Sequence, residues 1–209
     1  MAVKIEQFVI GPVGTNVYVI YDESHKAAVV IDPADRGDDI FEAIDNAGLS
    51  VAGILLTHGH FDHISGVAEL KKLSGCKVYA SVLEKELLMD PKLNESMGLG
   101  RKAVTVTPDI ELADGEKVTL GNIEFEAIST PGHTAGGMSY YLKSERALFS
   151  GDTLFEGSVG RCDLPTGSMS SIIRSIKDKL MILPEDTDVY PGHGEKTTIG
   201  NEKRYNPYL

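Results

Sequence analysis

Four residues that can bind a metal ion crowd into one short stretch, Thr57–His63. They are His58, His60, Asp62 and His63. The stretch follows the apolar run Gly53–Leu56, and a short apolar run bounded by glycine predicts a buried strand. The four side chains therefore lie in the loop that leaves a strand, where a rigid scaffold can hold them. Imidazole and carboxylate groups crowded together need a cation or water as a partner, which favours a metal site over solvated loop residues.

The spacing of these residues predicts that they point in two directions. Side chains two residues apart in an extended loop point the same way, so His58 and His60 should face one centre. Asp62 and His63 break this alternation, and a helical pattern begins at Ile64. One loop could therefore supply ligands to two neighbouring metal centres. The spacing differs from the His-Glu-x-x-His motif of zinc proteases, whose histidines are four residues apart on a helix.

Three further stretches repeat the order of apolar strand, turn and possible ligand. They are Thr130-Pro131-Gly132-His133-Thr134, Gly151-Asp152-Thr153 and Pro191-Gly192-His193-Gly194. Taken singly, each ligand could be a turn residue, as Asp152 after a glycine would be. Taken together, every histidine except His25 lies in a loop that follows a predicted strand. His25 lies in a polar turn and is expected to be solvated.

The number of candidate ligands bears on the number of metals. The candidates are His58, His60, Asp62, His63, His133, Asp152 and His193. A catalytic zinc takes three protein ligands and a water, so these seven are too many for one such ion. They suit two ions that share Asp152 as a bridge. Nitrogen and carboxylate ligands without thiolates fit zinc, iron or manganese.

Composition narrows the class of protein and its partners. The 209 residues, with 42% hydrophobic and 24% charged content, suit a single soluble domain over 1–209. The net charge of −11, with no basic run, argues against nucleic acid as a partner. No segment resembles a membrane span, and Met1–Glu6 lacks the pattern of a signal peptide. Because Cys76 and Cys162 are too few for a disulfide framework, we expect a cytoplasmic enzyme; its oligomeric state is not indicated.

Hydrophobic patterns predict a chain built mainly from short strands. Strands are predicted at 4–10, 16–21, 27–31, 53–56, 77–80, 103–106, 117–120, 123–129, 138–142, 147–149 and 188–190, and helices at 38–47, 64–73, 81–88 and 168–180. Asp90–Arg101 has no clear period and is expected to be a flexible surface segment. The polar residues of Gly192–Leu209 are too few for a further domain. Strand runs with amphipathic helices between them suit two packed sheets with helices on the outer faces.

The four ligand motifs, in this order, resemble those of the metallo-β-lactamase superfamily. The resemblance covers nearly the whole chain, and it implies an α+β fold: a four-layer αββα sandwich of two mixed sheets with helices on the outer faces. It also implies two divalent metal ions, with zinc expected first and iron or manganese as alternatives. One ion would be bound by His58, His60 and His133, and the other by Asp62, His63 and His193, with Asp152 between them.

A bridging aspartate in place of a cysteine ligand makes the chain more similar to glyoxalase II than to the true β-lactamases. Ser150–Phe155, followed by Gly160 and Arg161, is also similar to glyoxalase II and its short, single-domain relatives. The resemblance implies hydrolysis of an anionic hydroxyacyl thioester similar to S-lactoylglutathione. The nucleophile would be a hydroxide that bridges the two metals. Asp62 would orient this hydroxide and accept its proton, while Arg161 would contact the thiol carrier of the substrate.

Two departures from glyoxalase II concern the glutathione part of the substrate. Glyoxalase II adds a C-terminal helical domain that completes its glutathione site, and we expect this chain to be too short to contain one. Asp163 stands where the branch usually has a tyrosine, and it could pair with Arg161 instead of leaving this arginine for substrate. A thioester is therefore expected, whereas glutathione as its carrier stays open.

A second activity is compatible with the same motifs. Persulfide dioxygenases of this superfamily also carry Gly-Arg-x-Asp after the aspartate ligand, as Gly160–Asp163 does here. They use one iron ion, and the residues of this chain that match its ligands are His58, His133 and Asp152. Two histidines and one carboxylate leave positions on the iron open for oxygen. We favour hydrolysis because the ligand set suits two metals. The net charge argues against a nuclease, and no sequence feature specifically supports a lactonase. A non-catalytic metal-binding module would need metals with no open coordination position, and the ligand arrangement argues against that.

Overall fold

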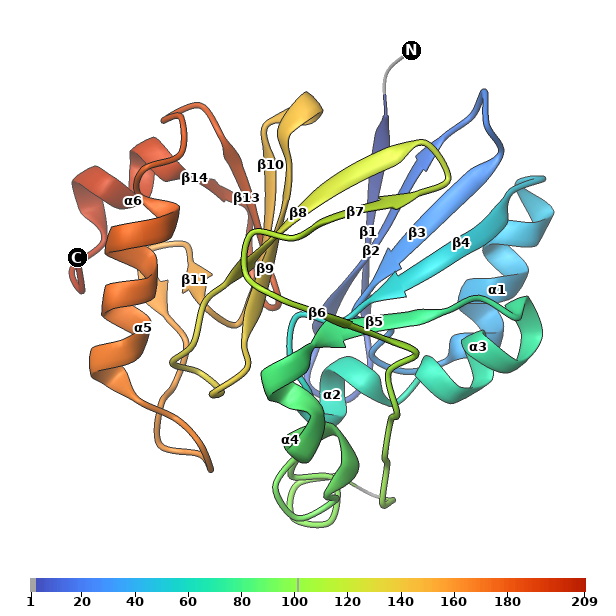
Figure 1. Cartoon of the computed structure of the whole chain (residues 1–209), viewed down its shortest axis with the longest axis horizontal. Helices are drawn as coiled ribbons and strands as arrows, with labels where there is room; N and C mark the ends of the chain where they lie inside the picture. Colours follow the sequence, from blue (N-terminus) through green and yellow to red (C-terminus); the bar gives the residue numbers. More distant parts are fainter. Residues whose placement is uncertain (1–2, 101) are drawn as a thin grey trace.

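Two sheets face each other, and helices cover the outer face of each one (Figure 1). The computed structural model describes residues 3–100 and 102–209. Within this part of the chain, each of the two sheets has six strands, in the orders β1-β2-β3-β4-β5-β6 and β14-β13-β10-β9-β8-β7. Both sheets mix parallel and antiparallel pairs. The expected four-layer αββα sandwich is confirmed.

The first sheet and its helices use the N-terminal half of the chain. The strands are β1 (Lys4–Ile10), β2 (Thr15–Asp22), β3 (Ala27–Ile31), β4 (Ser50–Leu55), β5 (Val78–Ser81) and β6 (Ile110–Leu112). The helices are α1 (Gly37–Asn46), α2 (Phe61–Ile64), α3 (Val67–Ser74), the short 3₁₀ helix η1 (Val82–Glu84) and α4 (Lys85–Met89). The helices α1 and α3 lie together on the outer face of this sheet (Figure 1).

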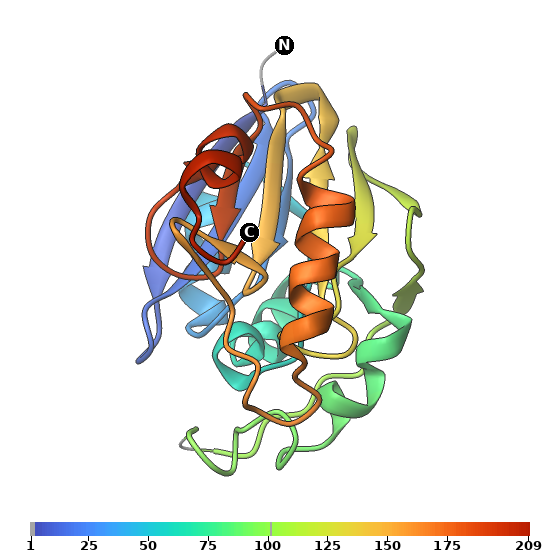
Figure 2. The ribbon, with the colours of Figure 1, turned by 90° about the vertical axis from the view of Figure 1, so that its left-hand side faces the viewer.

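The second sheet and its helices use the C-terminal half. Its strands are β7 (Lys117–Leu120), β8 (Ile123–Ser129), β9 (Met138–Leu142), β10 (Ala147–Gly151), β13 (Asp188–Pro191) and β14 (Thr197–Thr198), and β11 (Leu154–Phe155) pairs with β12 (Ser158–Val159) as a small hairpin. The helices are η2 (Lys143–Glu145), α5 (Met169–Ser175), its π-helical continuation η3 (Ile176–Leu180) and α6 (Ile199–Tyr205). Figure 2 looks onto the side that α5 and α6 cover.

Three layers of apolar side chains hold the sandwich together. Alternation along β2 sends Val17 and Val19 toward the α1–α3 side, while Tyr18 and Ile20 enter the space between the sheets. On the far side, Ile172 of α5 packs in a third cluster against the second sheet. Each of the three clusters buries one face of a sheet, with the outer two lying under the helices.

The predicted helix over 64–73 is interrupted. A Cβ on Gly66 would lie 2.8 Å from the carbonyl oxygen of Pro33, so the chain at this glycine packs directly against the loop after β3. Two helices result, α2 and α3, with Ser65 and Gly66 between them. The short α2 carries Asp62 and His63, so the helical backbone begins at Phe61, before the predicted start at Ile64.

One further predicted strand is wrong, and two C-terminal elements were not predicted. The stretch 103–106 forms no strand: its Val106 N–H donates to Leu88 O at 3.0 Å and its Val104 N–H to Ser96 Oγ at 3.0 Å. Val104 and Val106 alternate along a loop instead of a strand, and both pack against the apolar cluster under α1 and α3. The C-terminal stretch, given no element by its sequence, forms β14 and α6, which is capped by the Thr198 hydroxyl.

The described part of the segment predicted over Asp90–Arg101, residues 90–100, is packed more closely than a flexible surface segment would be. Asn94 and Ser96 are buried, and Asn94 O accepts the Phe61 N–H at 2.9 Å. Arg101, like Met1 and Ala2, lies outside the described residues. The segment is thereby tied to the start of α2, next to the candidate ligands.

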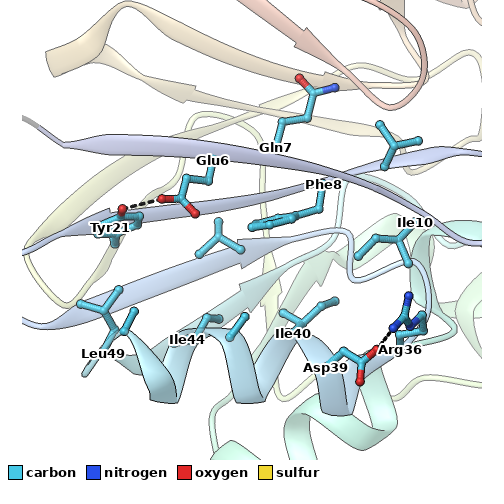
Figure 3. A pocket seen from close by; sticks show the side chains of 14 residues that line it. Glu6, Gln7, Phe8, Ile10, Tyr21, Arg36, Asp39, Ile40, Ile44 and Leu49 are labelled. Carbon is cyan, nitrogen blue, oxygen red and sulfur yellow. Dashed lines mark hydrogen bonds and ion pairs between the residues drawn. The ribbon is translucent and has the colours of Figure 1, made fainter.

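A groove of about 480 Å³ lies between β1 and α1 (Figure 3). Phe8 and Ile10 face the helix residue Ile40 across it, and a hydrogen bond from Tyr21 to Glu6 lies at one end. None of the candidate metal ligands lines this groove. Among the described residues, the helices are too short or too polar to cross a membrane.

Candidate metal centre

All the candidate ligands lie in segments that follow the ends of strands, at one edge of the sandwich. The strands β8, β10 and β13 run in the same direction, so the loops that follow them emerge together. These loops carry His133, Asp152 and His193. The loop after β4 joins them from the other sheet, since the Met138 N–H donates to Thr57 O at 2.8 Å. The strand-exit pattern in the sequence thus corresponds to a real convergence in space.

The first group of side chains consists of His58, His60 and His133, all buried. One nitrogen from each lies within 4.8 Å of the other two. The His60 Nδ1 and His133 Nε2 atoms are 2.9 Å apart. His133 Nδ1 lies 2.7 Å from the carbonyl oxygen of Arg161, which can only accept, so Nδ1 carries the proton and Nε2 is free to bind a metal.

The second group consists of Asp62, His63 and His193. His193 Nε2 lies 3.2 Å from Asp62 Oδ2 and 3.4 Å from His63 Nε2. His63 Nε2 lies 3.6 Å from Asp62 Oδ2. Three possible ligand atoms therefore face a common point beside the first group.

Asp152 lies between the two groups. Its Oδ2 is 3.6 Å from His133 Nε2 in the first group and 3.6 Å from His193 Nε2 in the second. Its Oδ1 is 3.4 Å from His63 Nε2. Gly192 makes room for this approach, because a Cβ there would lie 2.1 Å from Asp152 Oδ1.

Several buried atoms of the site need a partner that protein groups do not supply. Within the described residues, His58 Nε2, His60 Nε2 and Asp152 Oδ1 are buried without a hydrogen-bond partner. Buried polar atoms are normally paired, and three unpaired atoms in one place indicate a ligand that is not protein. Two imidazole nitrogens and a carboxylate oxygen are a donor set that divalent metal ions accept. The residues therefore fit metal binding.

The electrostatics of the site also suit a cation. Burial, followed by the neighbouring histidines, lowers the pKa of His58 well below its usual value, and burial lowers the pKa of His60 to about 3. Both rings are thus neutral near pH 7, the form that binds metals. Burial alone would raise the pKa of Asp152, but the charge of the nearby His63 holds that pKa below its usual value. Asp152 is therefore ionised.

The two groups differ in the protons they carry. Burial opposes charge on His63, yet Asp62 and Asp152 raise its pKa well above the usual value. The pKa of Asp62 is lowered, because His63 and His193 outweigh the effect of burial. Metal binding at the second group would release the proton of His63, since a ligand imidazole needs its nitrogen free.

Asp32 is a residue of the site that the sequence did not single out. Its Oδ1 accepts the Thr57 N–H at 2.8 Å, and its Oδ2 accepts the Thr57 hydroxyl at 2.5 Å and lies 2.9 Å from His63 Nδ1. Asp32 also forms a compact cluster with His58 and His63. Because both its oxygens already accept hydrogen bonds, it orients His63 instead of binding a metal. Asp32 directly follows β3, so it has the same position after a strand as the other candidate ligands. That position could have identified Asp32 as a residue of the site.

A cavity of about 620 Å³ opens onto both groups. Its floor holds His60, Asp62, His133, Asp152 and His193, and its walls hold Val13, Phe61, Glu95, Leu99, Phe155, Arg161 and Leu164. The walls are mainly apolar, and Arg161 is the cation among them. Arg161 forms a two-pronged ion pair with Asp163, at 2.7 and 2.8 Å, the pairing considered from the sequence.

Comparison with known proteins places the chain in a family. The family model of the metallo-beta-lactamase superfamily matches residues 10–193. The probable metallo-hydrolase YqgX of Bacillus subtilis is 37% identical over 207 residues, which cover 99% of this chain and 97% of YqgX. The hydroxyacylglutathione hydrolase GloC of Haemophilus influenzae is 34% identical over 196 residues, which cover 93% of this chain and 92% of GloC.

Three solved structures share the fold over nearly the whole chain. The B3 metallo-beta-lactamase BLEG-1 has a TM-score of 0.93 and 40% identity, covering 99% of both chains. TTHA1623 in a di-iron-bound form has a TM-score of 0.85 and 35% identity, covering 98% of this chain and 100% of its own. ETHE1 from Myxococcus xanthus has a TM-score of 0.79 and 30% identity, covering 98% and 83%. Family model, relatives and fold agree, and the chain belongs to the metallo-beta-lactamase superfamily.

Proposed function

We propose that the protein is a dinuclear metal-dependent hydrolase of anionic hydroxyacyl thioesters, of which S-lactoylglutathione is the model. The position of Asp152 carries this proposal. The Asp152 carboxylate lies within 3.6 Å of nitrogens from both ligand groups. A single carboxylate with both oxygens directed at neighbouring groups is suited to joining two metal ions.

The geometry supports a division of the ligands between two metals. His58, His60 and His133 would hold the first ion, Asp62, His63 and His193 would hold the second, and Asp152 lies between the two groups. Zinc is the first expectation, with iron or manganese as alternatives, and the di-iron form of TTHA1623 supports a two-metal site. When bound, the two ions would lower the pKa of a water molecule at the site and polarise the carbonyl group of the substrate.

Asp62 is the residue that we propose to handle the proton. Its pKa is held low, so it is ionised at neutral pH and can accept the proton of the attacking water. The Thr15 hydroxyl donates to Asp62 Oδ2 at 3.1 Å and fixes the direction of the carboxylate. Arg161, at the cavity wall, would attract the anionic thiol carrier despite the net charge of −11.

The likeness to GloC supports a thioester substrate and glutathione as its thiol carrier. GloC is named a hydroxyacylglutathione hydrolase, and the match covers 92% of it. The likeness to GloC therefore supports the proposal of a glutathione thioester. We also propose a cytoplasmic location, which the free Cys76 and Cys162 support.

The decisive experiment compares wild-type protein with Asp152→Ala. We expect about two metal ions per wild-type chain and hydrolysis of S-lactoylglutathione. Asp152→Ala should bind fewer metal ions and lose the activity, whereas Asp39→Ala, an exposed carboxylate in α1, should keep both. Wild-type metal content and activity in Asp152→Ala would rule out the bridge. Hydrolysis of a β-lactam but not of any thioester would replace the proposed substrate.

Persulfide oxidation by a single iron is the second candidate, and the Gly-Arg-x-Asp motif at Gly160–Asp163 favours it. It would use His58, His133 and Asp152 as ligands. Oxygen uptake with glutathione persulfide, together with one iron per chain, would support this activity. Two metals per chain and no oxygen uptake would support the hydrolase.

A further inference from the structure

We propose that Glu84 is a positioning residue, which fixes the geometry of the first metal group by holding the two loops that carry it. The inference rests on the proposed function only in requiring that His58, His60 and His133 bind a metal. Glu84 ends the short helix η1, and its side chain does not reach the substrate cavity. No sequence motif pointed to it.

The Glu84 carboxylate binds both loops at once. Its Oε1 accepts the Gly59 N–H at 2.8 Å, and Gly59 stands between His58 and His60. Its Oε2 accepts the Gly136 N–H at 2.9 Å and the Thr134 hydroxyl at 3.1 Å, and Thr134 directly follows His133. One side chain thus contacts residues next to all three ligands of the first group.

The contacts connect the two halves of the fold. Gly59 lies in the loop after β4 of the first sheet, whereas Thr134 and Gly136 lie in the loop between β8 and β9 of the second sheet. The distance between His60 and His133 therefore depends on how these loops approach each other. A carboxylate has a fixed span between its oxygens, so it sets this approach more rigidly than apolar packing would.

The segment that carries Glu84 is wedged between the same loops. A Cβ on Gly59 would lie 2.7 Å from a methyl group of Leu87, and a Cβ on Gly136 would lie 2.4 Å from the Glu84 backbone nitrogen. Both loops therefore press against the η1–α4 segment through glycines. The Leu87 side chain on one side and the Glu84 backbone on the other keep the loops apart, and the Glu84 carboxylate ties them together.

Burial makes this carboxylate unusual. Glu84 is 2% exposed, and within the described residues no lysine or arginine forms an ion pair with it. An uncompensated buried carboxyl is unfavourable, and here three donors offset the loss of hydration. An apolar residue would fill the space without that cost, but it would leave the two buried N–H groups of the loops without acceptors.

Glu84→Gln tests the role with little change of shape. An amide has one acceptor oxygen and one NH₂ donor, so one of the two backbone N–H groups must face another donor. The loops should then separate or shift, and the three nitrogens should lose their spacing. Loss of a partner that orients metal ligands typically weakens metal binding by about 10–100-fold.

Glu202 provides a matched control. It is also a buried carboxylate, 0% exposed, and its Oε2 accepts the Gly157 N–H at 2.9 Å while its Oε1 accepts the Thr197 hydroxyl at 2.6 Å. These contacts fasten α6 to the second sheet and involve none of the candidate ligands. Glu202→Gln should therefore lower stability without altering the metal site.

The experiment loads wild type, Glu84→Gln and Glu202→Gln with Co²⁺. It measures the Kd by chelator competition, the visible absorption of the bound ion and the melting temperature of each metal-free protein. We expect both variants to melt earlier. Only Glu84→Gln should show a Kd raised by about 10–100-fold and a changed Co²⁺ spectrum. Equal Kd values and spectra for both variants would overturn the role of Glu84, whereas failure of wild type to bind metal would overturn the proposed function instead.

A milder pair of variants decides the matter if Glu84→Gln does not fold. Thr134→Val removes one donor to Glu84 and leaves both N–H contacts. Thr187→Val is its control, because the Thr187 hydroxyl is buried and unpaired within the described residues. We expect a several-fold weaker Co²⁺ affinity in Thr134→Val alone. An affinity equal to that of Thr187→Val would overturn the proposal.

Discussion

Asp32 Oδ2 lies 2.9 Å from His63 Nδ1, and both side chains are buried. An ionised carboxylate can only accept a hydrogen bond, so this contact holds the proton of His63 on Nδ1. The other nitrogen, Nε2, then faces Asp62 and Asp152. The contact therefore selects the nitrogen with which His63 can bind a metal.

Replacing Asp32 with alanine should weaken the second metal centre. The variant loses the group that orients His63 and leaves the Thr57 N–H without its acceptor. We expect metal affinity at this centre to fall by about 10–100-fold, and stability to fall by roughly 1–3 kcal/mol. Metal titration followed by calorimetry checks the affinity. The exposed Asp39→Ala should behave as wild type, and an unaltered second binding step in Asp32→Ala would contradict the orienting role.

Removing metal should lower the melting temperature of the protein. An ion present at about 100 times its Kd stabilises the folded state by about 2.7 kcal/mol. For a chain of this length, that corresponds to a fall of roughly 5–10 °C on chelation. Differential scanning calorimetry with and without EDTA measures it. His133→Ala should respond less to EDTA, His25→Ala should respond like wild type, and equal melting temperatures of wild type with and without EDTA would contradict metal binding.

The sequence was most informative about side chains that follow strands. His133, Asp152 and His193 could be grouped from the sequence alone, because each follows a predicted apolar strand and a turn. The structure shows that these strands, β8, β10 and β13, run in the same direction. The roles of these residues as ligands stay predictions, and so does the single domain. The order of strands and helices also allowed the four layers to be expected, since each element shows one apolar face.

Contacts between distant stretches were not predictable in the same way. Glu84 and Asp32 each bind backbone N–H groups 25 residues away in the chain, and no local pattern encodes such a contact. The helix α6 was missed because it has few apolar residues, and it is held instead by hydrogen bonds to its buried Glu202. The strand expected at 103–106 failed because a buried loop can use the same alternation.

Removing the Arg161 side chain should weaken binding of an anionic substrate more than it slows the reaction. Arg161 and Asp163 are 57% and 68% exposed, so their ion pair can open and let the guanidinium meet a carboxylate of the substrate. We expect Arg161→Ala to raise KM by about tenfold with little change in kcat, and the effect should shrink at high salt. Steady-state kinetics measures both constants.

Two variants control for the Arg161 effect. Asp163→Asn should leave KM unchanged or lower it, because it frees the guanidinium. Arg146→Ala removes an exposed arginine that pairs with Asp186 elsewhere on the surface, and KM should not change. If Arg161→Ala and Arg146→Ala gave the same KM, the substrate would not use Arg161.

The stability of the metal-free protein should carry a pH dependence that comes from Glu84. Burial raises the pKa of its carboxyl from 4.5 to about 7, against the opposing hydrogen bonds from Gly59, Thr134 and Gly136. The folded state thus binds this proton more tightly than the unfolded state. The stabilisation from the protonated form is complete below pH 4.5, and it is lost as pH rises through about 7.

The loss between these limits should be about 3 kcal/mol, since each pH unit corresponds to about 1.4 kcal/mol. Glu84→Gln cannot titrate at this position, so the difference in unfolding free energy between wild type and variant isolates the effect. Urea denaturation at pH 5, 6, 7 and 8, with EDTA present to keep metal from the site, measures that difference. We expect wild type to lose stability relative to Glu84→Gln as the pH rises. A difference that is constant from pH 5 to pH 8 would mean that Glu84 stays ionised in the folded protein, with its three donors outweighing the cost of burial.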